Sequence, residues 1–141
     1  MSNVTASHAA YRRGEVLSAT PGQLVVMLYD GVITALLRAI DAVEAHDIER
    51  KCQHLNRAQA IIIQLEGTLN FELGGEIARN LQGLYAYSRA KITRANVENS
   101  AEFLRPLIEH FTTLRDAWKE GERRLTIQES QPGTFGTELH A

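Results

Sequence analysis

The histidine and glutamate residues of this chain could bind a metal ion together only if their spacing placed them on one helical face. In four-helix bundles, a carboxylate-bridged metal site uses Glu-x-x-His pairs that project inward. Glu44-Ala45-His46 has the wrong spacing, and Glu109 is directly followed by His110. Nowhere in the sequence does a histidine follow a glutamate by three residues. We therefore expect no metal ion and no cofactor.

A nucleophilic site is also poorly supported by local spacing. Cys52 is the only cysteine, and His54 lies two residues away, so the two side chains do not face each other on a helix. We expect Cys52 to be a buried structural thiol. Gly74-Gly75 is too short for a phosphate loop and lacks the Lys-Ser/Thr that would follow. Distant groups can still meet in space, so a small bundle enzyme or metal carrier stays open as an alternative. The motifs favour a protein that is not an enzyme.

Composition narrows the possible partners and compartments. The chain has 141 residues, 44% of them apolar and 23% charged, which fits one water-soluble domain. Its net charge of -2 argues against a nucleic-acid partner, because phosphate binding needs a clustered basic surface. We expect no membrane insertion, since no apolar stretch approaches the ~20 residues that span a bilayer. The N-terminus lacks the basic-then-apolar layout of a secretory signal, so we expect a cytoplasmic location.

Helix-capping residues predict where the first two helices begin. Thr20 as N-cap, Pro21 at the first helical position and Gln23 at the third form a capping box with the helix-opening proline. This helix should run to about residue 45. Asp47 can cap a second helix over about 48–69.

Glycine and serine mark the next two boundaries. Gly74-Gly75 separate the second helix from a third over about 76–97. Ser100 can cap a fourth helix over about 101–120, and Gly121 is a plausible end.

Pro106 does not fit the interior of the fourth helix. It removes one helical hydrogen bond and crowds the carbonyl of Glu102. The sequence therefore predicts either a kink near 102–106 or a helix that starts late.

Long helices joined by short connections favour an all-α fold, an antiparallel four-helix bundle over residues 20–120. Residues 1–19 and 121–141 have the composition of flexible N- and C-terminal segments.

The first two predicted helices carry more apolar residues than one buried face requires. At 100° per residue, the apolar arc of the first helix spans roughly 220°. Either these helices lie at the centre of the bundle, or a groove stays open for an apolar partner. Each exposed Leu or Ile forgoes roughly 1.5–3 kcal/mol of burial, so several together mark a binding surface. Central packing would account for most of these residues, but a bundle of only four helices has few neighbours to cover such an arc, so the groove stays open as the second interpretation. Its candidate contacts are the residues expected off the main apolar faces: Val26, Ile33, Leu37, Ile61 and Leu65.

Three motifs follow one another in a characteristic order. They are Thr20-Pro21 leading to Met27-Leu28-Tyr29-Asp30-Gly31, then GGEIA at 74–78 with Asn80-Leu81 and Leu84-Tyr85, and finally LRDAW at 114–118. Over about residues 11–120, the chain resembles the FliS family of flagellar export chaperones.

The resemblance implies a cytoplasmic helical bundle that holds unpolymerised flagellin. The client would be the C-terminal segment of flagellin, disordered as a monomer, which the chaperone wraps around itself. This would block premature assembly and help deliver the subunit to the flagellar export gate of the type III apparatus. An amphipathic segment could lie in apolar grooves, and the free protein would be a monomer or weak homodimer.

The resemblance also suggests roles for individual residues. The segment around Tyr11, Val16 and Leu17 would fold over part of the groove as a lid, or else be a disordered tail. Tyr85 and Tyr87 point to different sides of the third predicted helix, and Tyr87 is the candidate for an exposed contact. Asp30-Gly31 would set close helix packing and a local hydrogen bond. A helical regulator that sequesters another flagellar or transcriptional protein is the alternative.

Overall fold

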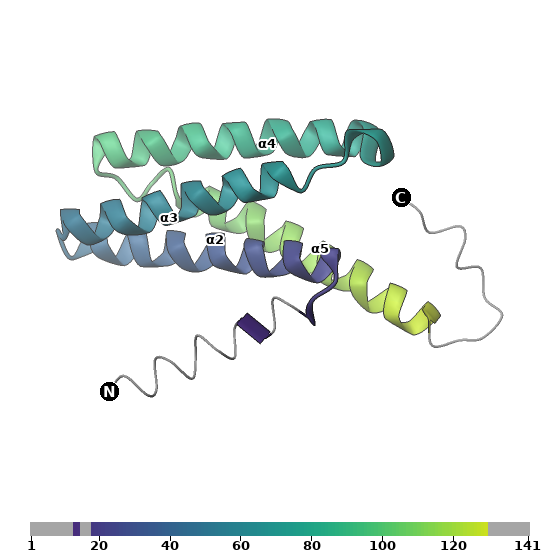
Figure 1. The fold of residues 1–141 in the computed structure, drawn as a ribbon. Coiled ribbons are helices and arrows are strands. Elements are labelled where there is room, and N and C mark those ends of the chain that lie inside the picture. Colours follow the sequence, from purple (N-terminus) through teal and green to yellow (C-terminus); the bar gives the residue numbers. More distant parts are fainter. Residues whose placement is uncertain (1–12, 15–17, 130–141) are drawn as a thin grey trace.

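Four long helices make up most of the described chain. The structure is a computed structural model that describes residues 13–14 and 18–129, and the helix labels follow Figure 1. The helices are α2 (Pro21–Glu44), α3 (Ile48–Gly67), α4 (Phe71–Glu98) and α5 (Arg105–Glu129). Successive helices run in opposite directions and are joined by short turns (Figure 1). The predicted all-α four-helix bundle is confirmed.

The starts of α2 and α3 are the predicted ones. The Thr20 hydroxyl accepts a hydrogen bond from the Gln23 amide at 3.1 Å, and the Thr20 amide donates to Gln23 Oε1 at 2.9 Å. Pro21 occupies the first helical position. Asp47 caps α3 by accepting from the Arg50 amide at 3.1 Å. Each cap satisfies a backbone N–H that has no partner within the helix.

α4 begins earlier than the sequence predicted. The expected start was Glu76, but the helix runs from Phe71, because Asn70 caps a first turn and accepts from the Leu73 amide at 3.0 Å. The predicted break is nevertheless present inside the helix, at Gly75, where φ is 48° and ψ is -119°. The glycine pair thus bends the helix and does not precede it.

We expect Gly75→Ala to destabilise the fold, because a side chain is disfavoured at positive φ. The loss in free energy of unfolding should be roughly 1–3 kcal/mol. Gly83→Ala is the matched control on the same helix, where an added Cβ meets nothing within 4 Å. It should stabilise the protein by about 0.5–1 kcal/mol, because alanine is the better helix former. Urea denaturation measures both, and equal unfolding midpoints for the two variants would contradict the prediction.

Pro106 is accommodated because α5 starts late. The first residue of the helix is Arg105, so the proline lies in the first turn, where a missing N–H removes no helical hydrogen bond. Ser100 does not cap this helix; its hydroxyl accepts from the Glu102 amide at 3.2 Å and shapes the preceding turn. Of the two outcomes that the sequence left open, the late start is the one found.

The expected end of α5 at Gly121 is wrong, since the helix continues to Glu129. Ion pairs on the helix surface connect Glu120, before the glycine, with two arginines after it. Glu120 Oε1 lies 2.7 Å from Arg123 Nη2 and 3.2 Å from Arg124 Nε. Hydrogen bonds from these two guanidinium groups, Arg123 first, lower the pKa of Glu120 to about 2. Such pairs, three and four residues apart, favour continuation of the helix.

The broad apolar arc of α2 results from its central place in the bundle. α2 packs against α3 on one side and α5 on another, while α4 packs against α3. Val26 and Ile33, expected off the buried face, are buried in the core, and so is Leu65 of α3. The interpretation that these helices contact neighbours on several sides is therefore correct for most of their apolar residues. Leu37 differs, with 49% of its surface exposed.

By length and composition alone, α2 could cross a membrane, so the expectation that no apolar stretch is long enough is wrong. Half of its most apolar window is buried inside the bundle. The core helix of a water-soluble protein has this same character, and packing accounts for the apolar residues of α2.

Three aromatic side chains join α2, α4 and α5 at the centre. The ring of Phe111 lies 6.0 Å from that of Tyr29 and 6.5 Å from that of Tyr85, nearly parallel to the latter. The two tyrosine hydroxyls are hydrogen-bonded at 2.6 Å. Burial raises the pKa of both tyrosines, and both stay neutral. Tyr87, by contrast, is 49% exposed, as the sequence predicted.

Asp30 and Gly31 each fix α2 against a different neighbour. The Asp30 carboxylate accepts from Arg115 Nη1 of α5 at 3.1 Å, so its hydrogen bond is long-range and not the local one expected. Gly31 allows α2 to approach α3, because an added Cβ would lie 3.0 Å from Ile61 Cδ1. The expectation of close helix packing at this position is confirmed.

Candidate partner-binding groove

An apolar hollow lies where α4 begins, between α4, α2 and the turn after α3. Its volume is about 420 Å³, and Leu73, Ile77 and Leu81 of α4 line one side. Val25 of α2 and the Trp118 indole of α5 also line it. The buried Tyr85 closes it toward the core. The aromatic centre of the bundle is thus also the base of this hollow.

A second hollow, of about 590 Å³, adjoins the first between α4 and the C-terminal part of α5. Ile77, Leu81 and Trp118 line both hollows, and Leu114 and Leu125 extend the apolar lining along α5. We call the two together the α4–α5 groove. It exists because α4 packs mainly on α3 and α5 mainly on α2, so the facing sides of α4 and α5 are not filled by each other.

Large apolar side chains of the groove are exposed to solvent. Ile77 is 70% exposed and Leu73 is 65% exposed, while Leu125 lies at the outer end of the groove. Burying a Leu or Ile side chain is worth roughly 1.5–3 kcal/mol, which the free protein does not gain here. A contiguous surface of this kind suits an apolar partner.

The C-terminal part of α5 is held in place as one wall of the groove. Glu122, which lines the groove, accepts a hydrogen bond from the Thr20 hydroxyl at 3.2 Å. Its carboxylate lies over Gly22, where an added Cβ would be 1.5 Å from Oε1. A negative charge is favourable at the positive end of α2, so the contact ties α5 to the start of that helix.

The six candidate contacts that the structure describes do not line this groove. Leu37 and Tyr87 are exposed on other surfaces, and Ile61 is half-buried beside Gly31. The other three helical candidates, Val26, Ile33 and Leu65, are buried, so their expected exposure is wrong. Tyr11 lies outside the described residues. The role of all seven in partner binding stays a prediction.

Sequence reasoning missed the residues that do line the groove. Ile77 and Leu81 lie in the third predicted helix, to which the sequence analysis assigned no excess of apolar residues, and Leu73 lies between the second and third predicted helices. The sequence did contain one signal. The large apolar residues Leu73 and Ile77 stand on either side of the short stretch Gly74-Gly75-Glu76. An exposed apolar turn at a bend is typical of a contact surface.

The side chains that could take part in catalysis or metal binding do not gather in one place among the described residues. Cys52 is half-buried and not fully buried as expected, and its thiol lies 3.5 Å from Oδ1 of Asn96 on α4. His54 is half-buried and His110 is exposed. Among the described residues, no three or more His, Cys, Asp or Glu side chains gather as a metal site would require.

The fold and the groove together define a class of protein: a small helical bundle with a preformed apolar groove, suited to binding an amphipathic segment.

Comparison with known proteins gives the family. The model of the family Flagellar protein FliS matches residues 2–124. The flagellar secretion chaperone FliS of Bacillus subtilis is 36% identical over 113 residues, 80% of this chain and 84% of the relative. That of Salmonella typhimurium is 38% identical over 117 residues, 82% and 87% respectively. The Campylobacter jejuni protein of the same name is 33% identical over 121 residues, 86% and 94% respectively. The chain belongs to the FliS family.

These relatives are named as secretion chaperones, and none of the three is named as an enzyme. The match covers all four helices up to residue 124. The resemblance noted from the three sequence motifs is therefore confirmed.

Proposed function

We propose that this protein binds the disordered C-terminal segment of flagellin in the cytoplasm. By holding that segment it prevents premature polymerisation, and it helps deliver the subunit to the flagellar type III export gate. Membership of a family of flagellar secretion chaperones supports the role. No catalytic step is needed, because binding and release are sufficient.

The α4–α5 groove is the observation that carries the proposal. It offers two adjoining hollows of about 420 and 590 Å³, with apolar side chains from α2, α4 and α5. A client segment that becomes helical on binding can place its apolar face there. Ordering a disordered segment costs roughly 2–5 kcal/mol or more, so the contact must be extensive. The burial of Leu73 and Ile77 offsets part of that cost.

The client is proposed to extend beyond the groove. Leu37 and Tyr87, each 49% exposed, are candidate contacts for the parts of the segment that wrap around other faces. Ile61 can contribute the exposed part of its side chain. Val26, Ile33 and Leu65 could contact a client only if the bundle opened, which makes them the weaker candidates.

The proposed lid around Tyr11, Val16 and Leu17 lies outside the described residues. Ser18 and Thr20 lead from that segment into α2, whose first turn adjoins Glu122 at the groove wall. Thr20, from which α2 begins, therefore lies beside the groove. We expect that deletion of residues 1–18 will change the affinity or the association rate for the client.

Titration with a synthetic peptide of the flagellin C-terminus tests the proposal. We expect the circular dichroism of the mixture to show more helix than the sum of the separate spectra, because the client folds on the groove. A peptide of the same composition in scrambled order is the control, since it keeps hydrophobicity but loses the helical face. No binding, or equal binding of the scrambled peptide, would refute flagellin as the client.

A further inference from the structure

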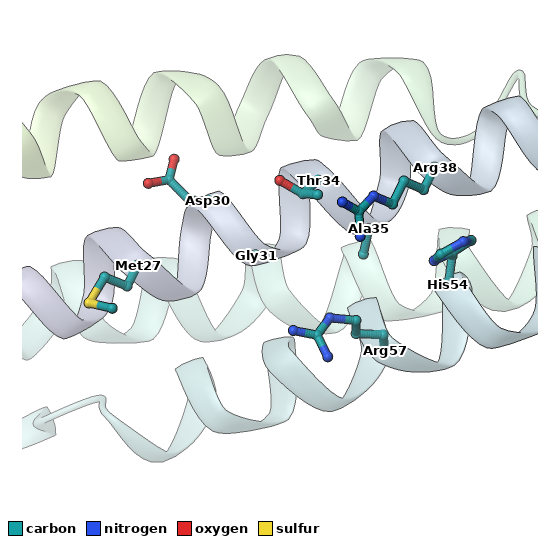
Figure 2. A pocket seen from close by; sticks show the side chains of 8 residues that line it. All are labelled: Met27, Asp30, Gly31, Thr34, Ala35, Arg38, His54 and Arg57. Atoms are coloured by element: carbon teal, nitrogen blue, oxygen red, sulfur yellow. The ribbon is translucent and has the colours of Figure 1, made fainter. Parts of the chain in front are cut away.

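A third hollow, with a different character, lies between α2 and α3. Its volume is about 410 Å³, and Figure 2 shows the side chains that line it. Two of them carry positive charge, Arg38 of α2 and Arg57 of α3, and His54 of α3 adds an imidazole. Thr34 adds a hydroxyl and Met27 a flexible apolar side chain. We call this hollow the α2–α3 pocket.

The space exists because small residues face α3 at this point. Gly31 and Ala35 line the base, and neither has a side chain long enough to fill the hollow. The long side chains of Arg38 and Arg57 come from opposite helices and border the same space (Figure 2). The pocket is thus part of the helix packing and does not depend on a loop.

The two arginines have no acidic partner in the part of the chain that the structure describes. Both side chains are exposed, while His54 is half-buried beside them. The nearest carboxylate in the lining is Asp30, which points away toward α5 and is paired with Arg115 at 3.1 Å (Figure 2). The net charge that the pocket presents is therefore positive.

We propose that the α2–α3 pocket binds the carboxylates of an acidic helix in a partner protein. Guanidinium groups form bidentate hydrogen bonds with carboxylates, and two of them on separate helices can each receive one carboxylate of the partner. Arginine and methionine are both enriched at protein interfaces, and Met27 adds an apolar side chain at the end of the lining away from Arg38 (Figure 2).

A protein carboxylate fits this site better than free phosphate. Phosphate sites in proteins commonly use backbone N–H groups at a helix N-terminus or in a glycine-rich loop. The α2–α3 pocket lies along the middle of two helices, where the backbone N–H groups are already bonded within the helix. Only side chains are available, as is usual at an interface between proteins.

The pocket and the α4–α5 groove lie on opposite sides of α2. Val25 lines the groove and Thr34 lines the pocket. They are nine residues apart, which is about two and a half helical turns and so half a rotation. Occupation of the groove itself therefore leaves the pocket open.

Peptide titration followed by NMR tests the acidic-helix partner. The probe is an alanine-rich helical peptide of about 18 residues, or five turns, with two glutamates one turn apart. A peptide with glutamine in place of both glutamates is its control. We expect the glutamate peptide to shift the amide signals of Thr34 and Arg57, and the glutamine peptide to leave them unchanged.

The double variant Arg38→Gln/Arg57→Gln should weaken glutamate-peptide binding roughly tenfold, since it removes both charged partners. Arg79→Gln, an exposed arginine of α4 outside the pocket, should leave it unchanged. Equal binding by the double variant would overturn the proposal. So would saturable binding of inorganic phosphate that displaces the glutamate peptide, because the pocket would then be a small-anion site. The flagellin peptide should bind the double variant as tightly as the wild type. The proposed flagellin binding and the proposed acidic-helix binding can therefore be refuted independently of each other.

Discussion

Replacing Ile77 with aspartate is expected to weaken binding of the flagellin C-terminal peptide at least tenfold, which corresponds to about 1.4 kcal/mol or more. Ile77 lines both hollows of the α4–α5 groove and is 70% exposed in the free protein. Aspartate removes the apolar contact and places a charge where the client would exclude water. Isothermal titration calorimetry measures the change in affinity.

The variant should fold normally, because a mostly exposed side chain contributes little to the core. Val97→Asp is the matched control: it makes the same kind of change on the same helix, at a side chain that is 80% exposed and outside the groove. Its affinity for the client should equal that of the wild type. If Ile77→Asp bound the peptide as tightly as Val97→Asp, the groove would not be the client site.

The bundle could be predicted because its signals are local. The capping box at Thr20 and Gln23 and the Asp47 cap act within one helical turn, so the sequence alone reveals them. Pro106 likewise restricts the backbone close to itself, and one of its two predicted outcomes is found. An error arose where a distant contact contributes, as at Gly121, beyond which the hydrogen bond between Glu122 and Thr20 of another segment supports a longer helix.

The groove could not be predicted because it depends on how helices are arranged. Ile77 and Val26 are both apolar residues on apolar helices, yet one is exposed and the other buried. Val26 is buried because α2 has neighbours on several sides, whereas Ile77 is exposed because α5 diverges from α4 beside it. Residue spacing gives the face of a helix on which a side chain lies. Residue spacing does not show which of these faces will pack against another helix.

Hallmark residues of the motifs serve mainly to hold the helices together. Asp30 pairs with Arg115 of α5, and Gly31 allows close contact with α3. Tyr29 and Tyr85, from the first and second motifs, share a buried hydrogen bond at the base of the groove. Their contribution to function is therefore indirect. They position α2, α4 and α5 so that the space between α4 and α5 stays open.

Replacing Phe111 with alanine should reduce the free energy of unfolding by about 3–5 kcal/mol, the usual cost of such a change in a packed core. The side chain is fully buried and contacts the rings of Tyr29 and Tyr85. Its loss leaves a cavity at the junction of α2, α4 and α5, and removes aromatic contacts worth about 0.5–1.5 kcal/mol each. Urea denaturation followed by circular dichroism measures the loss.

Phe111→Leu separates these two causes, because leucine fills much of the cavity but provides no ring. It should cost clearly less than alanine, with the remainder reporting the aromatic contacts to the two tyrosines. The ring of Phe111 is nearly parallel to that of Tyr85, so Tyr85→Leu should lower the additional cost of Phe111→Leu, as expected for residues in direct contact. A loss for Phe111→Ala below about 1 kcal/mol would show that this junction is loosely packed, contrary to the role assigned to the aromatic centre.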